Sequence, residues 1–107
     1  RIRIVGQARN GEEGLDLVRR VSPDVLLTDL RMPRLDGFSV IRRARDLHPD
    51  LKILAMSTDD SSPTVNRALR AGADGFISKD SLYQDIETAL GKVANGESFV
   101  RRARERQ

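Results

Sequence analysis

Short runs of aliphatic and β-branched residues alternate along this chain with longer stretches of helical periodicity, and this alternation restricts the fold more than any other feature. The runs at residues 2–5, 25–28, 53–56 and 76–78 are the expected strands, and an amphipathic stretch follows each of them. Strands separated by helices pair in parallel, and the helices then cover both faces of the sheet. The sequence therefore predicts an α/β fold with a doubly wound parallel sheet.

Capping residues and helix breakers set the expected limits of the four helices. The predicted N-caps are Asn10, Asp36, Ser62 and Ser81, and the residues expected to stop the helices are Pro23, Pro49, Gly72 and Gly96. Glu13 supports the first cap, and Gln84 forms a capping box with Ser81. Pro63 follows Ser62 at the expected first position of the third helix.

The composition suits one soluble domain with a single hydrophobic core, because the chain has 107 residues, 38% apolar and 33% charged. It has no cysteine, which excludes disulfides, thiolate catalysis and zinc–sulfur sites. No apolar run is long enough to span a membrane, and no signal-peptide pattern opens the chain. We therefore expect no membrane partner and a cytoplasmic location.

The isoelectric point near 9.9 raises the question of nucleic-acid binding. Four arginines and one glutamate lie in residues 101–107, and they account for the whole net charge of +3. The body of the chain is therefore formally neutral, whereas a duplex-binding domain needs a basic folded face that contacts many phosphates. We expect residues 1–100 to form the domain and residues 101–107 to be a basic linker.

Three polar side chains, Asp29, Ser57 and Lys79, follow successive buried strands of the predicted sheet. Parallel sheets carry their chemistry at the carboxyl ends of the strands, so these groups should converge at one edge. A carboxylate can attack phosphorus to form an acyl phosphate, which adds a charge of about −1.5 to −2 and three acceptor oxygens. An ammonium group can neutralise one oxygen, a hydroxyl can donate to another, and Mg²⁺ usually binds the rest. The constellation predicts a site that accepts a phosphoryl group.

Two segments carry a close resemblance to one protein family. Residues 24–33, followed by Asp36 and Gly37, resemble the phosphoacceptor strand and loop of response-regulator receiver domains. Residues 71–80 resemble the final strand of the same domains. The resemblance covers essentially the whole chain, and it implies a flavodoxin-like (CheY-like) fold.

The spacing of the site residues and the C-terminal pattern refine this resemblance. The intervals from Asp29 to Ser57 and from Ser57 to Lys79 are similar to those of the family. Asp80 follows Lys79 where many receivers have proline, and the last helix ends at residues 95–97 in an Asn-Gly-Glu pattern. Both features resemble the NarL/FixJ branch.

The resemblance implies a role for each residue that matches the motif. Asp29 takes the place of the phosphoacceptor, Ser57 that of the switch hydroxyl, and Lys79 that of the phosphate-binding lysine. Phe76 takes the place of the switch aromatic. Mg²⁺ would bind the Asp29 carboxylate and the backbone carbonyl of Arg31.

Some of these positions also admit a plain structural interpretation. Ser57 is preferred to its neighbour Thr58 mainly on spacing, and Phe76 is as compatible with ordinary core packing as with a moving switch. Asp59 lies where receivers tune the lifetime of the acyl phosphate. Asp59 and Asp60 together fit the start of a solvated loop better than they fit a metal site.

The chain departs from the family at its N-terminus. Receivers begin with a strand that ends in a pair of acidic residues, followed by a first helix, and neither is present here. The resemblance therefore implies an N-terminally incomplete sheet, in which residues 2–5 lose their partner strand and the Mg²⁺ site loses its acidic pair. Three explanations remain open: a truncated chain, which we favour, a fragment completed by another chain through strand exchange, or a rearranged sheet.

The resemblance implies a receiver domain of a two-component response regulator that a histidine kinase phosphorylates on Asp29, and that is not itself an enzyme. It implies a homodimer, with DNA binding only through an absent C-terminal helix-turn-helix domain to which residues 101–107 would lead. The alternative is a non-phosphorylated pseudo-receiver that serves as a dimerisation or docking module, which the absent acidic pair supports.

Two further function classes fit the sequence less well. A phosphatase or hydrolase would need a second catalytic acid or base near Asp29, and none is evident. DNA binding through the tail would depend steeply on salt.

Overall fold

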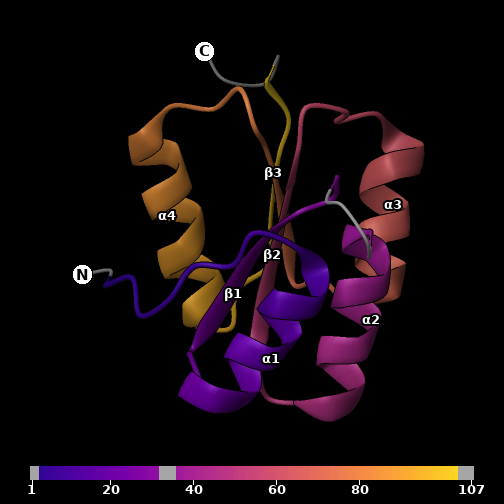
Figure 1. Ribbon diagram of the computed structural model, residues 1–107. Coiled ribbons are helices and arrows are strands. Elements are labelled where there is room, and N and C mark those ends of the chain that lie inside the picture. The colour runs from indigo at the N-terminus through magenta and orange to yellow at the C-terminus, as the bar shows by residue number, and fades with distance from the viewer. Residues whose placement is uncertain (1–2, 32–35, 104–107) are drawn as a thin grey trace.

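The computed structural model describes residues 3–31 and 36–103, and within them helices and strands alternate as the sequence predicts (Figure 1). The elements are α1 Gly11–Val21, β1 Val25–Asp29, α2 Gly37–Leu47, β2 Lys52–Ser57, α3 Ser62–Ala71, β3 Gly75–Ser78, α4 Tyr83–Ala94 and β4 Phe99–Arg101. No helix in these two ranges is long and apolar enough to cross a membrane.

The strands form one sheet in the order β1-β2-β3-β4, and every neighbouring pair is parallel. The predicted parallel α/β fold is therefore confirmed. In the register of the sheet, Asp29 lies opposite Met56, and Ser57 lies opposite Ser78. This register brings the carboxyl ends of β1, β2 and β3 to the same edge, which is the upper edge in Figure 1.

Helices cover both faces of the sheet, and each face has its own hydrophobic core (Figure 1). On one face, residues of α1, α2 and α3 pack with Ile53, Ala55 and Phe76 of the strands. On the other face, α4 packs on Leu54 and Ile77. Neighbouring residues of a strand point to opposite faces, and this is why a continuous apolar run such as residues 53–55 is buried on both sides.

The α4 face is only partly covered next to β1. Leu27 points to this face and remains 37% exposed, while Leu54 on the neighbouring strand is fully buried. In the described ranges, α4 is the helix that packs on this face, and the buried strand residues beneath it are Leu54 of β2 and Ile77 of β3. The sheet therefore has room for a further helix or strand beside β1.

The strand predicted at residues 2–5 is wrong for the part that the structure describes. Residues 3–8 form no strand, and Ile4 and Val5 are 70% and 48% exposed; Ile2 lies outside the described residues. A strand needs a neighbour that accepts its backbone hydrogen bonds. The strand that would stand between these residues and β1 is missing from the described ranges, so the segment has nothing to pair with.

Two of the four predicted N-caps are confirmed. The side chain of Asn10 accepts a hydrogen bond from the Glu13 amide at 2.9 Å, and that of Asp36 accepts one from the Ser39 amide at 3.0 Å. Gly72 ends α3, as predicted, with φ of 126°.

The caps predicted at Ser62 and Ser81 are wrong by one residue. The N-cap of α3 is Ser61, so Ser62 is already helical, and the N-cap of α4 is Leu82. The Ser81 amide instead donates to the carbonyl of Ser78, and this turn delays the start of α4.

The strand β4 was not predicted, and it adds a fourth member to the sheet beside β3. Its residues Phe99–Arg101 pair with Gly75–Ile77. Arg101, which we expected to open the basic linker, lies in this strand. The division between a domain at 1–100 and a linker at 101–107 stays a prediction, since residues 104–107 lie outside the described ranges.

Candidate functional site

Asp29 and Lys79 meet at the carboxyl edge of the sheet, where the sequence predicted that they would converge. Asp29 is the last residue of β1, and Lys79 directly follows β3. The Lys79 ammonium donates to Asp29 Oδ2 at 2.5 Å. The Asp29 side chain is 22% exposed and the Lys79 side chain 50% exposed, so the pair is open to solvent on one side.

The loop after β1 holds the second oxygen of the same carboxylate. The backbone amide of Arg31 donates to Asp29 Oδ1 at 2.9 Å, and the amide of Leu30 continues the strand pairing by donating to the Met56 carbonyl. The start of α2 also lies against this loop, because the Gly37 amide donates to the Leu30 carbonyl at 3.2 Å. Each carboxylate oxygen has two acceptor positions, so both keep a lone pair free of these donors.

Ser57 ends β2 between the other two residues and is almost fully buried, with 2% of its surface exposed. Its hydroxyl oxygen accepts a hydrogen bond from the Asp59 amide at 3.1 Å, and its carbonyl accepts one from the Lys79 amide at 2.9 Å. The structure thus ties Ser57 to the loop that follows it and to the residue that carries the ammonium group. The side chain of the alternative hydroxyl, Thr58, is exposed.

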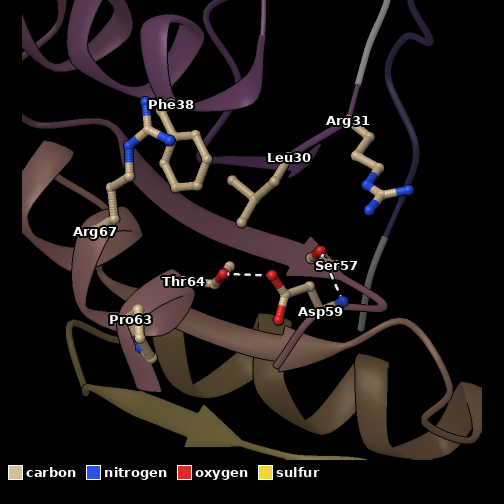
Figure 2. Close-up of a pocket in the computed structure, with 8 residues that line it drawn as sticks. All are labelled: Leu30, Arg31, Phe38, Ser57, Asp59, Pro63, Thr64 and Arg67. Carbon is tan, nitrogen blue, oxygen red and sulfur yellow. Dashed lines mark hydrogen bonds between the residues drawn. The ribbon is translucent and has the colours of Figure 1, made fainter. Parts of the chain in front are cut away.

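Asp59 is the centre of a small polar turn at the start of α3 (Figure 2). The Thr64 hydroxyl donates to Asp59 Oδ2 at 2.6 Å, and the Ser61 amide donates to Oδ1 at 3.1 Å. These hydrogen bonds, that of Thr64 above all, hold the pKa of the Asp59 carboxyl below its usual value, with a smaller contribution from the charge of Arg31. The interpretation of Asp59 as part of a loop start agrees with these contacts.

An open pocket of about 300 Å³ lies beside the site, between the loop after β1 and the start of α3 (Figure 2). Arg31, Ser57, Asp59 and Thr64 line its polar side. On its other side the Arg67 guanidinium lies 3.9 Å from the centre of the Phe38 ring; Leu30 and Pro63 complete the lining. Ser57 therefore borders this pocket, whereas Asp29 is not among the residues that line it.

Phe76 is fully buried in β3, and it belongs to the core beneath α1, α2 and α3. It lies opposite Ala55 of β2 and opposite Val100 of β4. This position is two residues before Ser78 at the carboxyl edge. In this structure Phe76 is an ordinary core residue, and its role as a switch stays a prediction.

The described residues do not by themselves provide a Mg²⁺ site. Asp29 contributes one carboxylate and Arg31 one backbone carbonyl, whereas a small hard cation needs a set of about six oxygens. No group of three or more histidine, aspartate or glutamate residues that could hold a metal ion is found in residues 3–31 and 36–103.

Two features of the site were not found from the sequence. Thr64 holds Asp59 from five residues away, and Gly37 lets the start of α2 approach the loop after Asp29. The sequence indicates Asp36 as an N-cap, and it indicates Gly37 only as part of the family motif. A Thr at this distance from an Asp has no distinctive sequence signal, because the turn that joins them is irregular.

Comparison with known proteins agrees with this geometry. Residues 1–91 match the response regulator receiver domain. The chain is 34% identical over 99 residues to the response regulator GacA of Pseudomonas viridiflava, and 35% identical over 102 residues to the nitrate/nitrite response regulator NarL of Escherichia coli. These alignments cover 92% and 95% of this chain. The chain belongs to the response regulator receiver domain family of two-component systems, close to the NarL type.

Solved structures support the same assignment. The signal receiver domain of a NarL response regulator from Mycobacterium tuberculosis superposes with a TM-score of 0.85 and 37% identity, over 89% of this chain and 77% of that one. A response regulator from Burkholderia pseudomallei, at 31% identity and a TM-score of 0.73, contains a phosphorylated aspartic acid and a calcium ion. That alignment covers 85% of this chain and 54% of the other.

The chain spans about half the length of the curated relatives it matches, 46% of GacA and 47% of NarL. The similarity therefore concerns the receiver portion of those proteins. The activities of the full-length relatives are therefore only proposed for this chain.

Proposed function

We propose that this chain is a phosphoacceptor receiver domain, in which Asp29 takes a phosphoryl group from a histidine kinase or from a small phosphodonor. The observation that carries the proposal is the contact of 2.5 Å between Lys79 Nζ and Asp29 Oδ2, two residues that are 50 positions apart in the sequence. A partly exposed carboxylate with an ammonium group beside it suits a reaction that places extra negative charge at that point.

The chemistry is a displacement at phosphorus. One Asp29 carboxylate oxygen attacks the phosphorus atom and forms a P–O bond, while the bond from phosphorus to the donor breaks and its electron pair leaves with the donor. No general base is required, because a carboxylate is ionised at neutral pH. Lys79 stabilises the added charge, and the Arg31 amide keeps the carboxylate oriented.

Ser57 and Phe76 are the proposed switch residues. Ser57 has a hydroxyl at the same edge as Asp29, and turning it toward the phosphoryl group gives that group a further hydrogen-bond donor. The turn leaves space next to β3, where Phe76 is buried. The phosphoryl group shifts the balance between the two arrangements only through the contacts that differ between them.

The proposed output follows the NarL and GacA relatives, which are response regulators of greater length. We propose that the domain dimerises and controls a DNA-binding domain C-terminal to it, in the cytoplasm. Mg²⁺ as the accompanying ion is part of the same proposal, and its remaining ligands would have to come from outside the described residues, from phosphate oxygens or from water.

The deciding experiment is intact-mass measurement after incubation with acetyl phosphate, with and without Mg²⁺. We expect a gain of about 80 Da, one phosphoryl group in place of a proton, in the wild type. Asp29→Asn should show no gain, and Asp24→Asn, at the residue just before the start of the same strand, should gain as the wild type does. A wild type without the gain, or a gain that persists in Asp29→Asn, contradicts the proposal.

The second candidate is a pseudo-receiver that is never phosphorylated and serves as a dimerisation or docking module. The observation in its favour is that no group of three or more acidic or histidine residues that could hold a metal ion lies around Asp29 in the described ranges. Under this alternative, the mass stays unchanged with acetyl phosphate, and Asp29→Asn leaves binding to partner proteins intact.

A further inference from the structure

The C-terminal residues 99–103, which we name the strap, lie along β3 and reach the edge of the sheet that carries Asp29 (Figure 1). Phe99–Arg101 pair in parallel with Gly75–Ile77. A Cβ atom on Gly75 would lie 2.6 Å from the Phe99 carbonyl oxygen, so the absence of a side chain at Gly75 allows this close pairing. The strap thus occupies the outer edge of β3, between the starts of α3 and α4.

Asp60 holds the end of the strap from the loop between β2 and α3. The Arg102 side chain donates to the Asp60 carbonyl through Nε at 2.9 Å and to the Ser62 hydroxyl through Nη2 at 3.3 Å. The Ala103 amide donates to Asp60 Oδ2 at 2.9 Å. Contacts across 42 and 43 positions of sequence join this one loop to the end of the strap, and we name them the clasp.

A second attachment holds the strap on its other side. The Arg101 guanidinium lies 3.3 Å from Asp85 in the first turn of α4, and both side chains are mostly buried, at 35% and 15% exposed. The same guanidinium lies 5.4 Å from the centre of the Phe99 ring. This attachment involves α4 and not the loop after β2, so it can persist when the clasp opens.

The loop that carries the clasp is also the loop that Ser57 holds. The Ser57 hydroxyl oxygen accepts from the Asp59 amide at 3.1 Å, and Asp60 is the next residue. Hydrogen bonds and one peptide bond therefore connect Ser57, through Asp59 and Asp60, to Arg102 and Ala103. One peptide unit therefore separates Asp59, whose amide Ser57 accepts, from Asp60, which holds the end of the strap.

We propose that the strap is a displaceable element whose release Ser57 controls. With the Ser57 hydroxyl on the Asp59 amide, Asp60 is positioned to hold Arg102 and Ala103. When the hydroxyl turns toward Asp29, the Asp59 amide loses its acceptor, the loop shifts, and the clasp opens. The trigger, a phosphoryl group on Asp29, rests on the proposed function, whereas the coupling of Ser57 to the strap does not.

The consequence concerns the C-terminal segment of the chain itself. A held strap keeps Ala103 at the acceptor edge and covers the outer edge of β3. An open clasp frees Arg102 and Ala103, while the Arg101–Asp85 attachment keeps Phe99–Arg101 beside β3. The state of the acceptor site would thus be reported directly to whatever the strap leads to.

The first test measures the clasp without any phosphodonor. NMR-detected exchange of the Ala103 amide should become about tenfold faster in Asp60→Ala, because the substitution removes the carboxylate that accepts from this amide, and one net hydrogen bond is equivalent to about such a factor. Asp50→Ala, an aspartate in a loop at the opposite edge of the sheet, is the control and should leave this exchange unchanged. Unchanged Ala103 exchange in Asp60→Ala overturns the clasp.

The second test measures the coupling. Ser57→Ala removes the acceptor of the Asp59 amide and should also speed Ala103 exchange, while Ser57→Thr keeps a hydroxyl and should preserve protection. The melting temperature and the exchange of core amides in α3 serve to detect general unfolding. If Ser57→Ala loosens the core but leaves Ala103 no more exposed than the rest of the molecule, the coupling is wrong.

The third test adds acetyl phosphate and follows both intact mass and Ala103 exchange. A gain in mass together with faster Ala103 exchange supports the proposal. A gain in mass with unchanged exchange overturns the release of the strap and leaves the phosphoacceptor function standing. No gain in mass contradicts the phosphoacceptor function alone, and Ser57→Ala then decides the coupling.

Discussion

Gly37, at the start of α2, lies against the backbone of Asp29 so closely that a Cβ atom on it would stand 2.5 Å from the Asp29 carbonyl oxygen. The same Cβ would overlap the Cα atom of Leu30. Both neighbours are backbone atoms, so neither can move aside without displacing the loop after β1. The first turn of α2 is therefore part of the support of the acceptor residue.

Gly37→Ala should destabilise the fold by about 1–3 kcal/mol, the range for inserting a methyl group into a packed region. Chemical denaturation measures the change. Gly91→Ala in α4 is the matched control, because nothing lies within 4 Å of its added Cβ. It should be neutral or stabilising by up to about 1 kcal/mol, since alanine is the better helix former. Equal effects of the two substitutions would contradict the role of Gly37.

Lys79→Ala should slow phosphoryl transfer to Asp29 by about 10- to 100-fold, while it changes stability by less than about 1 kcal/mol. The reason is that a half-exposed ion pair adds little to folding, whereas the ammonium group meets the charge that the reaction adds. The rate of the mass gain with acetyl phosphate and a urea denaturation curve measure the two quantities.

Lys92→Ala is the control for Lys79→Ala. Lys92 is similarly exposed and lies 3.7 Å from Glu97, away from the acceptor edge. It should leave the rate of phosphoryl transfer unchanged. A rate in Lys79→Ala equal to that in Lys92→Ala would remove Lys79 from the proposed machinery.

Much of the fold follows from signals that are local in sequence. The runs at 25–28, 53–56 and 76–78 are strands because aliphatic residues without alternation suit a sheet that is buried on both faces. Asp29 and Lys79 could be brought together from sequence because parallel strands place their carboxyl ends at one edge. The register of the sheet then aligns the ends of β1, β2 and β3.

The misses arise where tertiary context decides. Ile4 and Val5 have the composition of a strand, but strand formation depends on a neighbour that the described residues do not supply. Phe99–Arg101 have only three residues, too few for a periodic signal, and they pair because Gly75 admits them. The clasp at Asp60 joins residues that are more than 40 positions apart, so no local sequence pattern predicts these contacts.

Arg45→Ala should destabilise the fold by about 2–4 kcal/mol, because one guanidinium satisfies several backbone carbonyls and a carboxylate. Arg45 donates to the carbonyls of Pro49, Leu51 and Gly72 and to Asp74, whose carboxylate in turn accepts from the Ile53 amide. Chemical denaturation measures the change. Arg42→Ala, an exposed arginine on the same helix, is the control and should stay within about 0.5 kcal/mol.

Asp36→Ala should destabilise the fold by about 1 kcal/mol at neutral pH, because it removes the N-cap of α2. The hydrogen bond from the Ser39 amide, before all other causes, holds the pKa of the Asp36 carboxyl below its usual 3.8. A carboxyl with a lowered pKa in the folded state contributes stability that is present above the usual value, and that stability is lost as the pH falls through the lowered value. The difference between wild type and Asp36→Ala should therefore shrink in acid below that usual value.

Two comparisons separate the charge of Asp36 from its hydrogen bond. Asp36→Asn keeps an oxygen that accepts from the Ser39 amide but does not titrate, so its stability relative to Asp36→Ala should vary little with pH. Asp46→Ala removes a carboxylate from the last turn of the same helix, where negative charge opposes the helix dipole, so it should be neutral or slightly stabilising. Denaturation curves recorded from neutral to acidic pH measure all four proteins. A constant gap between the wild type and Asp36→Ala across this range would show that the cap acts without its charge.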